Sequence, residues 1–322
     1  MKGRSGFTCS NEKLNRLHEV CRRTFRSNLQ GVQSDCPGRE KFGYGGDIAC
    51  TADAFWCNYD MRAFYRKTVR DFLDEASVDG WITETAPYVG IASNPVAPRK
   101  DEKSRGAAPM DWAVGLPVLL DSLARYVGDL DIVREAYPTL ARYIGLVRAL
   151  YPQNDIPKCL GDWIPAVGSE KADATMSALA HWHQFVLLTA KFARLLGREG
   201  EAAEYVRLAD AIATRYRQAY VRDGIVCKGS QGDQLFALYH GLLPEEETPR
   251  AYARLKADIA RRGNSLTTGI FATKYMLEVL PLRGGRRIGR RGHDARALSG
   301  LVRDVGSRGD HAVRRLERGQ VP

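Results

Sequence analysis

The sequence predicts an all-α fold made of antiparallel helix pairs. In most segments apolar residues recur at helical spacing, and the alternation of apolar and polar residues that marks a β-strand is nearly absent. Long connections rich in Pro and Gly recur on alternate junctions between the helical segments. Helix pairs whose long loops collect on one side are typical of a toroid or bundle with a functional face.

Helical segments follow one another through most of the chain. The first spans 11–29, where the residues on one face are Leu14, Leu17, Val20, Cys21 and Phe25. Further helices are expected at 48–60, 61–77, 110–128, 130–151, 174–197 and 199–221, with shorter ones near 233–243, 245–263 and 268–280. The intervening loops are expected at 34–47, 78–109 and 152–173, and loops of this length in a compact domain are usually functional.

Charge divides the chain into two parts. The last forty residues, 283–322, contain 11 Arg and four acidic residues, a net charge of 11 − 4 = +7, so the other 282 residues carry only +3 of the total +10. We therefore expect a folded domain over 1–282 and a disordered Arg/Gly-rich tail over 283–322. Basic tails can bind phosphates, which makes nucleic-acid binding an alternative function. This tail lacks RGG repeats and interleaved aromatic residues, so no nucleic-acid partner is expected.

Several other classes of protein are not expected. No run of about 18 apolar residues indicates a membrane span, and the first residues lack the apolar segment of a signal peptide. Seven scattered cysteines without CxxC spacing predict neither a zinc site nor a disulfide framework. We expect a cytoplasmic chain with no metal, no other cofactor and no membrane partner; the sequence does not indicate an oligomeric state.

Three carboxylates lie close together in the loop SDCPGREKFGYGGD. Asp35, Glu40 and Asp47 fall within thirteen residues and are interleaved with Arg39 and Lys41. Acid–base catalysis uses carboxylates in unlike environments, because one must stay protonated while another is ionised. The alternative is a solvated turn in which Asp47 caps the following helix.

Three tryptophans sit in or beside loops, each near an acidic residue. They are Trp81 in DGWITETAP, Trp112 in MDWAVG and Trp163 in GDWIP. Sugar rings have apolar faces and polar edges, so aromatic side chains flanked by carboxylates suit a carbohydrate ligand. The alternative is that these tryptophans fill the core beneath the loops.

The loop DCPGREKFGYGGD resembles the signature loop of glycoside hydrolase family 78, the α-L-rhamnosidases, which commonly reads D-C-P-x-R-(D)-E-x-x-G-W-x-G-D. Later segments match the family in order, among them YVGDLDIVREAYPTLARYI, GDWIP and LTTGIFATKYMLEVL. The resemblance covers roughly 11–280. This loop is one residue shorter than the R-D-E form, and Tyr44 stands where the family usually has Trp.

The resemblance implies an (α/α)6 barrel of the six-hairpin glycosidase type and a hydrolase of terminal α-L-rhamnosides that inverts the anomeric centre. Glu40 would be the general acid, and the substrate would be a rhamnose-containing oligosaccharide or glycoside. The residues expected to bind it are Asp35, Arg39, Tyr44, Asp47, Trp81, Trp112 and Trp163. Tyr44 and the shortened loop leave a six-hairpin glycosidase of another sugar specificity as the alternative.

The end of the chain departs from the family. The family's general base lies in a segment like G-A-T-T-x-W-E-x-W, and nothing after Leu280 resembles it. Read with a one-base shift, residues 298–316 permit F-P-G-W-Y-G-M-L-E-A-G-A-T-T-L-Y-D-V-W. We therefore expect a frameshift near 283–286, with the codon of the general base overlapping Arg314. The barrel would then lack its last helices and its general base, and the chain would be inactive or nearly so.

Overall fold

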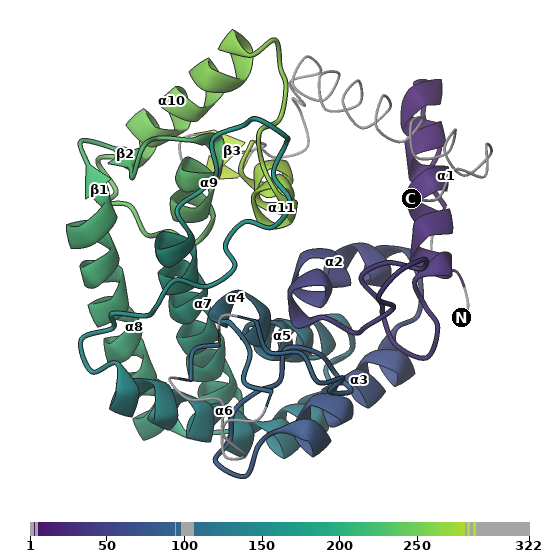
Figure 1. The fold of residues 1–322 in the computed structure, drawn as a ribbon, viewed down its shortest axis with the longest axis vertical. Coiled ribbons are helices and arrows are strands. Elements are labelled where there is room, and N and C mark those ends of the chain that lie inside the picture. Colours follow the sequence, from purple (N-terminus) through teal and green to yellow (C-terminus); the bar gives the residue numbers. More distant parts are fainter. Residues whose placement is uncertain are drawn as a thin grey trace.

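The computed structural model describes residues 3, 6–93, 95–97 and 106–280, together with the backbone of 282–283 and 286–287. The expectations about missing barrel helices, the frameshift and the tail concern 283–322, which apart from that backbone lies outside the described residues. The described chain is mostly helical and its helices follow a ring in chain order (Figure 1). The predicted all-α, six-hairpin class is confirmed.

The helices begin and end close to the expected positions. They are α1 (Glu12–Ser27), α2 (Gly45–Asn58), α3 (Arg62–Glu75), α4 (Met110–Ala113), α5 (Gly115–Val127), α6 (Leu130–Leu150), α7 (Ala174–Leu195), α8 (Glu199–Tyr220), α9 (Gln231–Tyr239), α10 (Thr248–Arg261) and α11 (Ile270–Val279). Two short antiparallel pairs accompany them: β1 (Val221–Arg222) with β2 (Ile225–Val226), and β3 (Leu282–Arg283) with β4 (Arg286–Arg287).

Two local features differ from the sequence prediction. The helix expected over 110–128 is divided at Val114 into α4 and α5. Pro117, which has no N–H to donate to the carbonyl of Ala113, stands in the first turn of α5. The β1–β2 hairpin was not predicted. Its turn residues Asp223 and Gly224 both have positive φ, 52° and 72°, as an Asp-Gly turn of type I′ requires.

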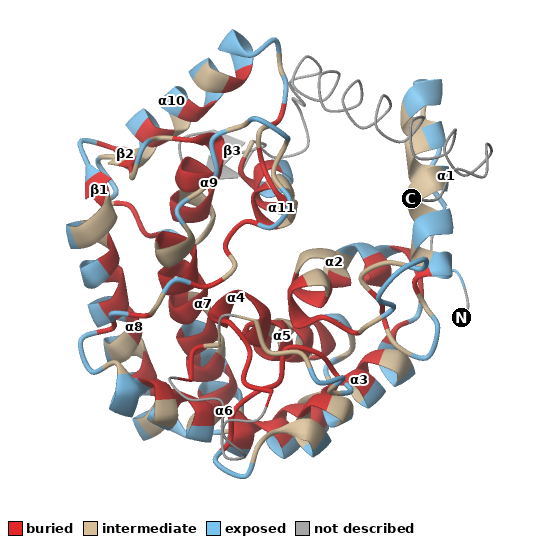
Figure 2. Cartoon of the chain, viewed as in Figure 1, coloured by how far each residue is buried: buried red, intermediate tan, exposed pale blue. Residues whose placement is uncertain are grey.

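The helices form an inner and an outer layer. Inner helices α2, α5, α7, α9 and α11 each contact the next, and α11 returns to contact α2. Outer helices α1, α3, α6, α8 and α10 lie around them (Figure 1). Burial follows this arrangement: α7 is buried along most of its length, whereas α1 has no fully buried residue (Figure 2). The described residues thus supply five outer–inner helix pairs.

Long connections gather at one face of the ring. Those that lead into the N-terminal ends of the inner helices cover 28–44, 76–109, 151–173, 221–230 and 262–269. Those that leave the C-terminal ends cover only 59–61, 128–129, 196–198 and 240–247. The face at the N-terminal ends of the inner helices therefore carries most of the loop residues, including the signature loop and all three loop tryptophans. None of the helices in the described part of the chain is long and apolar enough to cross a membrane.

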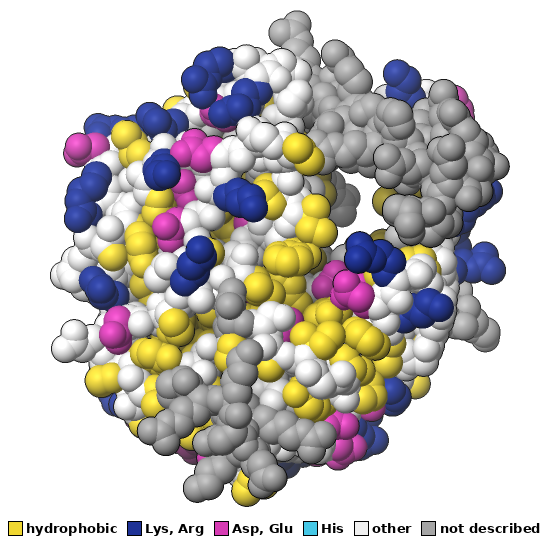
Figure 3. Space-filling model, in the orientation of Figure 1, with side chains coloured by type: hydrophobic (Ala, Val, Ile, Leu, Met, Phe, Trp, Pro, Cys, Tyr) yellow, Lys and Arg dark blue, Asp and Glu magenta, His cyan; other side chains and the backbone are white. Residues whose placement is uncertain are grey.

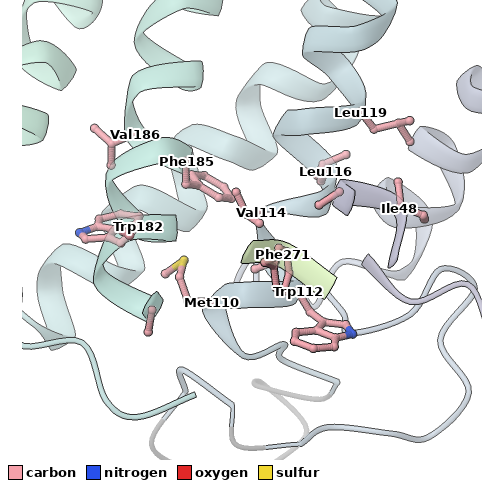
Figure 4. Close-up of a cluster of buried hydrophobic side chains, with 14 of the residues drawn as sticks. Ile48, Met110, Trp112, Val114, Leu116, Leu119, Trp182, Phe185, Val186 and Phe271 are labelled. Atoms are coloured by element: carbon pink, nitrogen blue, oxygen red, sulfur yellow. The ribbon is translucent and has the colours of Figure 1, made fainter. Parts of the chain in front are cut away.

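Apolar side chains of the inner helices pack between the two layers. Trp182 and Phe185 of α7 are fully buried, and Phe185 stacks on Tyr143 of α6 with ring centroids 4.7 Å apart. Met110 and Leu116 extend this cluster toward α2 (Figure 4). This packing sets the positions of the helix ends from which the loops project.

We expect Phe185→Ala to lower the free energy of unfolding by about 3–5 kcal/mol, because a fully buried ring is removed from a close-packed layer. Leu187→Ala on the same helix is the matched control. Its side chain is 40% exposed, so the loss should stay below about 1 kcal/mol. Urea denaturation of both variants measures the difference, and equal losses would contradict the assignment of Phe185 to the core.

Candidate active site

The signature loop projects from the face as a small closed loop. The N–H of Asp35 donates to the carbonyl of Phe42, and the N–H of Phe42 donates to Oδ1 of Asp35, both at 3.0 Å. Lys41 lies between these contacts with φ 63°, in the left-handed region. Glu40 is therefore exposed near the end of the loop, while Asp35 is half-buried at its base.

Glycines let the end of this loop approach its neighbours closely. A Cβ on Gly45 would lie 2.3 Å from the carbonyl oxygen of Trp112, and one on Gly46 would lie 2.6 Å from the Trp112 indole. Neither distance is compatible with a side chain. The N-terminus of α2, with Asp47 in its first turn, is consequently seated directly on Trp112.

A second segment, 81–88, pairs with the loop. The N–H of Gly45 donates to the carbonyl of Glu84, and the N–H of Ala86 donates to the carbonyl of Gly43, both at 3.0 Å. This pairing brings Glu84 beside the three predicted carboxylates. Glu84 is 1% exposed and accepts the N–H of Ser93 at 2.5 Å. Glu84 was not among the predicted site residues; its only signal in the sequence is its place in the TETAP segment beside Trp81.

The carboxylates influence one another's ionisation. Burial raises the pKa of Asp47 to about 7, and the negative charges of Asp35 and Glu40 add to this effect. Burial also raises the pKa of Glu84, with a smaller contribution from the charge of Glu40. The site thus combines a carboxyl that keeps its proton near neutral pH with the exposed carboxylate of Glu40.

Tyr44 joins this group. It is 9% exposed, and burial, a hydrogen bond with Glu40 and the charges of Glu40, Glu84 and Asp35 raise the pKa of its hydroxyl. Tyr44 therefore stays a neutral donor beside the acidic side chains. Asp35, Glu40, Tyr44 and Asp47 thus lie near one another, and their roles in binding and catalysis stay predictions. Figure 3 shows acidic side chains beside the hollow next to α2.

Arg39 is placed differently. It is exposed, and within the described residues no hydrogen bond or ion pair joins it to the carboxylates. Its expected contact with substrate stays a prediction.

The three tryptophans occupy unlike places. Trp163 is 44% exposed and meets Trp112 edge-on, with ring centroids 6.1 Å apart. Trp112 is buried against Phe271 of α11, and its indole N–H has no partner among the described residues (Figure 4). Trp81 is buried and packs edge-on against Tyr143 of α6. Trp163 alone of the three thus presents a broad ring surface, and contact of Trp81 with substrate stays a prediction.

Each of two Asp–Trp pairs uses its aspartate as an anchor. Asp162 accepts the N–H groups of Gly269, Phe271 and Ala272 at 2.7, 3.1 and 3.1 Å and so caps α11. The carbonyl of Trp163 accepts the N–H of Ile270 at 2.9 Å. Burial raises the pKa of Asp162 to about 6 against the opposing effect of these hydrogen bonds. The loop that carries Trp163 is therefore fastened to the N-terminus of α11.

Asp111 anchors the other pair. Its Oδ2 accepts the N–H of Gly161 at 2.8 Å, and its Oδ1 lies 2.8 Å from Nδ1 of His181. Nε2 of His181 lies 2.9 Å from the hydroxyl of Tyr275. All of these side chains are buried, so the network ties α4, α7, α11 and the 151–173 loop together beneath the face. The repeated Asp-Trp pair, in MDW and in GDW, is the sequence signal for this anchoring role of Asp111 and Asp162.

No group of three or more His, Cys, Asp or Glu side chains in the described parts of the chain is arranged to hold a metal ion. What the face offers chemically is proton transfer and hydrogen bonding. An exposed carboxylate, a carboxyl that is protonated near neutrality, a tyrosine hydroxyl and an aromatic surface together suit a polyhydroxylated ligand.

Comparison with known proteins identifies relatives. A family model for the bacterial α-L-rhamnosidase six-hairpin glycosidase domain matches residues 2–289. An α-L-rhamnosidase of Formosa agariphila is 27% identical over 300 residues, covering 86% of this chain and 30% of the relative. An α-L-rhamnosidase of Streptomyces avermitilis is 30% identical over 277 residues, covering 83% of this chain and 25% of the relative.

Solved structures agree with these relatives. A Streptomyces avermitilis α-L-rhamnosidase complexed with L-rhamnose has a TM-score of 0.78 at 26% identity, over 87% of this chain and 26% of that chain. An α-L-rhamnosidase from Dictyoglumus thermophilum has a TM-score of 0.76 at 25% identity, over 92% of this chain and 34% of that chain. This chain therefore spans only a part, about a third or less, of the length of these proteins.

Gly46→Ala should lower the free energy of unfolding by about 1–3 kcal/mol, because the new methyl group would overlap the Trp112 ring. It should also change the tryptophan emission of the folded chain. Gly38→Ala is the control in the same loop, since a Cβ there meets no atom within 4 Å. An unchanged unfolding midpoint for Gly46→Ala in chemical denaturation would contradict the close seating of α2 on Trp112.

Asp47 should make stability fall as pH rises. Its folded pKa of about 7 lies above its ordinary value of 3.8, so between these values the folded chain keeps a proton that the unfolded chain has lost. Stability contributed by this proton is complete below about pH 4 and is lost through pH 7. Asp47→Asn should flatten this part of the pH profile of the unfolding free energy. Asp79→Asn, at an exposed carboxylate, should leave the profile as it is. Identical profiles for both variants would contradict the raised pKa of Asp47.

Proposed function

The chain belongs to the family of bacterial α-L-rhamnosidase six-hairpin glycosidase domains, and from this premise we propose that the carboxylate-lined face binds terminal α-L-rhamnosyl groups and protonates the departing glycosidic oxygen. The observation that carries this proposal is the group of Asp35, Glu40, Asp47 and Glu84 around Tyr44 at the N-terminus of α2. The natural ligand would be a rhamnose-containing oligosaccharide or glycoside.

Glu40 is the proposed proton donor. It is the exposed carboxylate of the group, so it can reach an oxygen of a ligand that lies on the face. A general acid has to lie within hydrogen-bonding distance of the oxygen that it protonates, and an exposed side chain beside a bound sugar can meet this condition. The hydroxyl of Tyr44 lies beside this carboxyl group.

Asp35 and Asp47 are the proposed acceptors for sugar hydroxyl groups. Both are held by the fold: Asp35 by the N–H of Phe42, and Asp47 by its place in the first turn of α2. Trp163 would cover the apolar face and the methyl group of the sugar, since an aromatic ring suits such a surface.

Inversion needs a second carboxylate on the opposite side of the sugar, about 6.5–9.5 Å from the acid, so that a water fits between them. By resemblance this base belongs to the segment whose codon overlaps Arg314, outside the described residues. A largely apolar groove of about 590 Å³ lies between α2 and α11, lined by Ile164, Leu266 and Leu277 among others. We propose that this groove receives the helical segment encoded in the shifted frame, and that the present chain carries the acid without the base.

The purified chain should therefore bind L-rhamnose but show little or no turnover of an aryl α-L-rhamnoside. Restoring the shifted reading frame from about codon 283 should give an active enzyme. In that enzyme Glu40→Gln should lower kcat by at least about a hundredfold, the usual size of a general-acid contribution. Robust turnover by the present chain, still seen after removal of residues 281–322, would refute the frameshift.

Tyr44 favours a second candidate, a six-hairpin glycosidase of another sugar. The family's signature loop usually has Trp at this position, and the N–H donor of a Trp side chain would lie at a different point from the Tyr44 hydroxyl. A panel of aryl glycosides and free monosaccharides separates the two candidates: preference for L-rhamnose supports the first, and preference for another sugar supports the second. Tyr44→Trp should shift the preference toward rhamnose if this residue sets it.

A further inference from the structure

A second pocket lies on the same face of the ring. It has a volume of about 290 Å³ and is formed by the loop before α9, by the last two turns of α10 and by Glu170 of the 151–173 loop. Its charged lining consists of Lys228, Arg254, Arg261, Arg262, Asp258 and Glu170. Lys and Arg side chains gather over the α10 region of the face in Figure 3.

The charges in this pocket do not cancel. Arg261 and Arg262 both pair with Asp258, and Nε of Arg262 lies 2.9 Å from Asp258 Oδ2. Lys228 and Arg254 have no carboxylate partner among the described residues. With four cations against two carboxylates, the lining carries an excess of 4 − 2 = two positive charges. This excess is notable because residues 1–282 as a whole carry only +3.

The pocket is connected to the candidate active site through the loop that carries Trp163. Ser230, in the pocket wall, caps α9. A Cβ on Gly232, two residues further on, would lie 3.5 Å from Oδ2 of Asp162, the residue that fastens Trp163 to α11. Helices α10, α9, α11 and α2 follow one another around the ring (Figure 1). The basic pocket is lined from α10 and the loop before α9, Trp163 is hydrogen-bonded to Ile270 at the start of α11, and Asp47 lies in the first turn of α2.

We propose that this pocket binds an acidic group, the carboxylate of a uronic acid or a sulfate ester, on the saccharide to which the rhamnose is attached. Guanidinium groups form paired hydrogen bonds with carboxylate and sulfate oxygens, and the unpartnered Arg254 and Lys228 supply donors for them. The acidic group around Glu40 repels an anion, whereas the basic pocket attracts it. An acidic saccharide therefore lies across Trp163 with its neutral rhamnosyl end at the carboxylates.

The orientation of the saccharide rests on the proposed function, but binding of an acidic sugar in the pocket does not. Isothermal titration calorimetry on the full chain tests the binding of an acidic sugar, with glucuronate, glucose 6-sulfate and neutral glucose as probes. We expect glucuronate, glucose 6-sulfate or both to bind more tightly than glucose, and the binding to weaken with added salt. The two acidic probes distinguish the uronate from the sulfate ester.

Arg254→Ala and Lys228→Ala should each weaken binding of the acidic probe roughly three- to tenfold. Arg207→Ala is the matched control, because Arg207 is an exposed arginine of α8 outside the pocket. Circular dichroism checks that each variant folds. Because Lys228 lies in a loop, Lys228→Ala tests the pocket even if Arg254→Ala unfolds α10. Equal binding of glucose and both acidic probes, or undiminished binding by both folded variants, would overturn the proposal.

Titration with L-rhamnose separates this proposal from the proposed function. Loss of rhamnose binding with retained binding of an acidic probe would contradict the rhamnosyl site and leave the pocket standing. The reverse result would remove the pocket and leave the rhamnosyl site.

Discussion

The face of this protein depends on the close seating of the N-terminus of α2 on Trp112. Gly45 and Gly46 allow backbone and indole to approach to distances that exclude any side chain. The same approach aligns Gly43 and Gly45 for hydrogen bonding with the 81–88 segment, which introduces Glu84. One steric condition thus assembles four carboxylates and Tyr44 from two loops. Burial, with a smaller contribution from the charges of Asp35 and Glu40, accounts for the raised pKa of Asp47.

Beneath this surface the charges have a structural role. Asp111 and Asp162 are buried and hydrogen-bonded. Asp111 holds Gly161 of the 151–173 loop and contacts His181 of α7, and Asp162 holds the N-terminus of α11. The carboxylates that reach the surface are left for ligand chemistry. Across the face, the acidic group at α2 and the basic pocket at α9 and α10 form two regions of opposite charge with Trp163 between them. Charge complementarity of this kind would favour one orientation of the proposed acidic saccharide.

Much of the fold could be predicted from the sequence, because helical periodicity is a local property. The limits of α1, α7 and α11 follow it closely. The division before α5 and the β1–β2 hairpin were missed, although Pro117 and the Asp223-Gly224 turn were local signals for them. The signature loop could be recognised, and with it Asp35, Glu40 and Asp47. Three features could not be predicted: the place of Glu84 in the site, the burial of Trp81, and the shared pocket of Lys228 and Arg254. Each depends on which loops meet in space, and no short-range sequence pattern specifies that.

The central claim is that the signature loop and Trp163 form a site for L-rhamnose. A crystal structure of the chain soaked or grown with L-rhamnose tests it most directly. We expect the sugar at the N-terminus of α2, with its hydroxyl groups on Asp35 and Asp47, Glu40 within hydrogen-bonding distance of the anomeric oxygen, and Trp163 against its apolar face. Rhamnose bound elsewhere, or bound here with Asp35 and Asp47 turned away from it, would contradict this assignment.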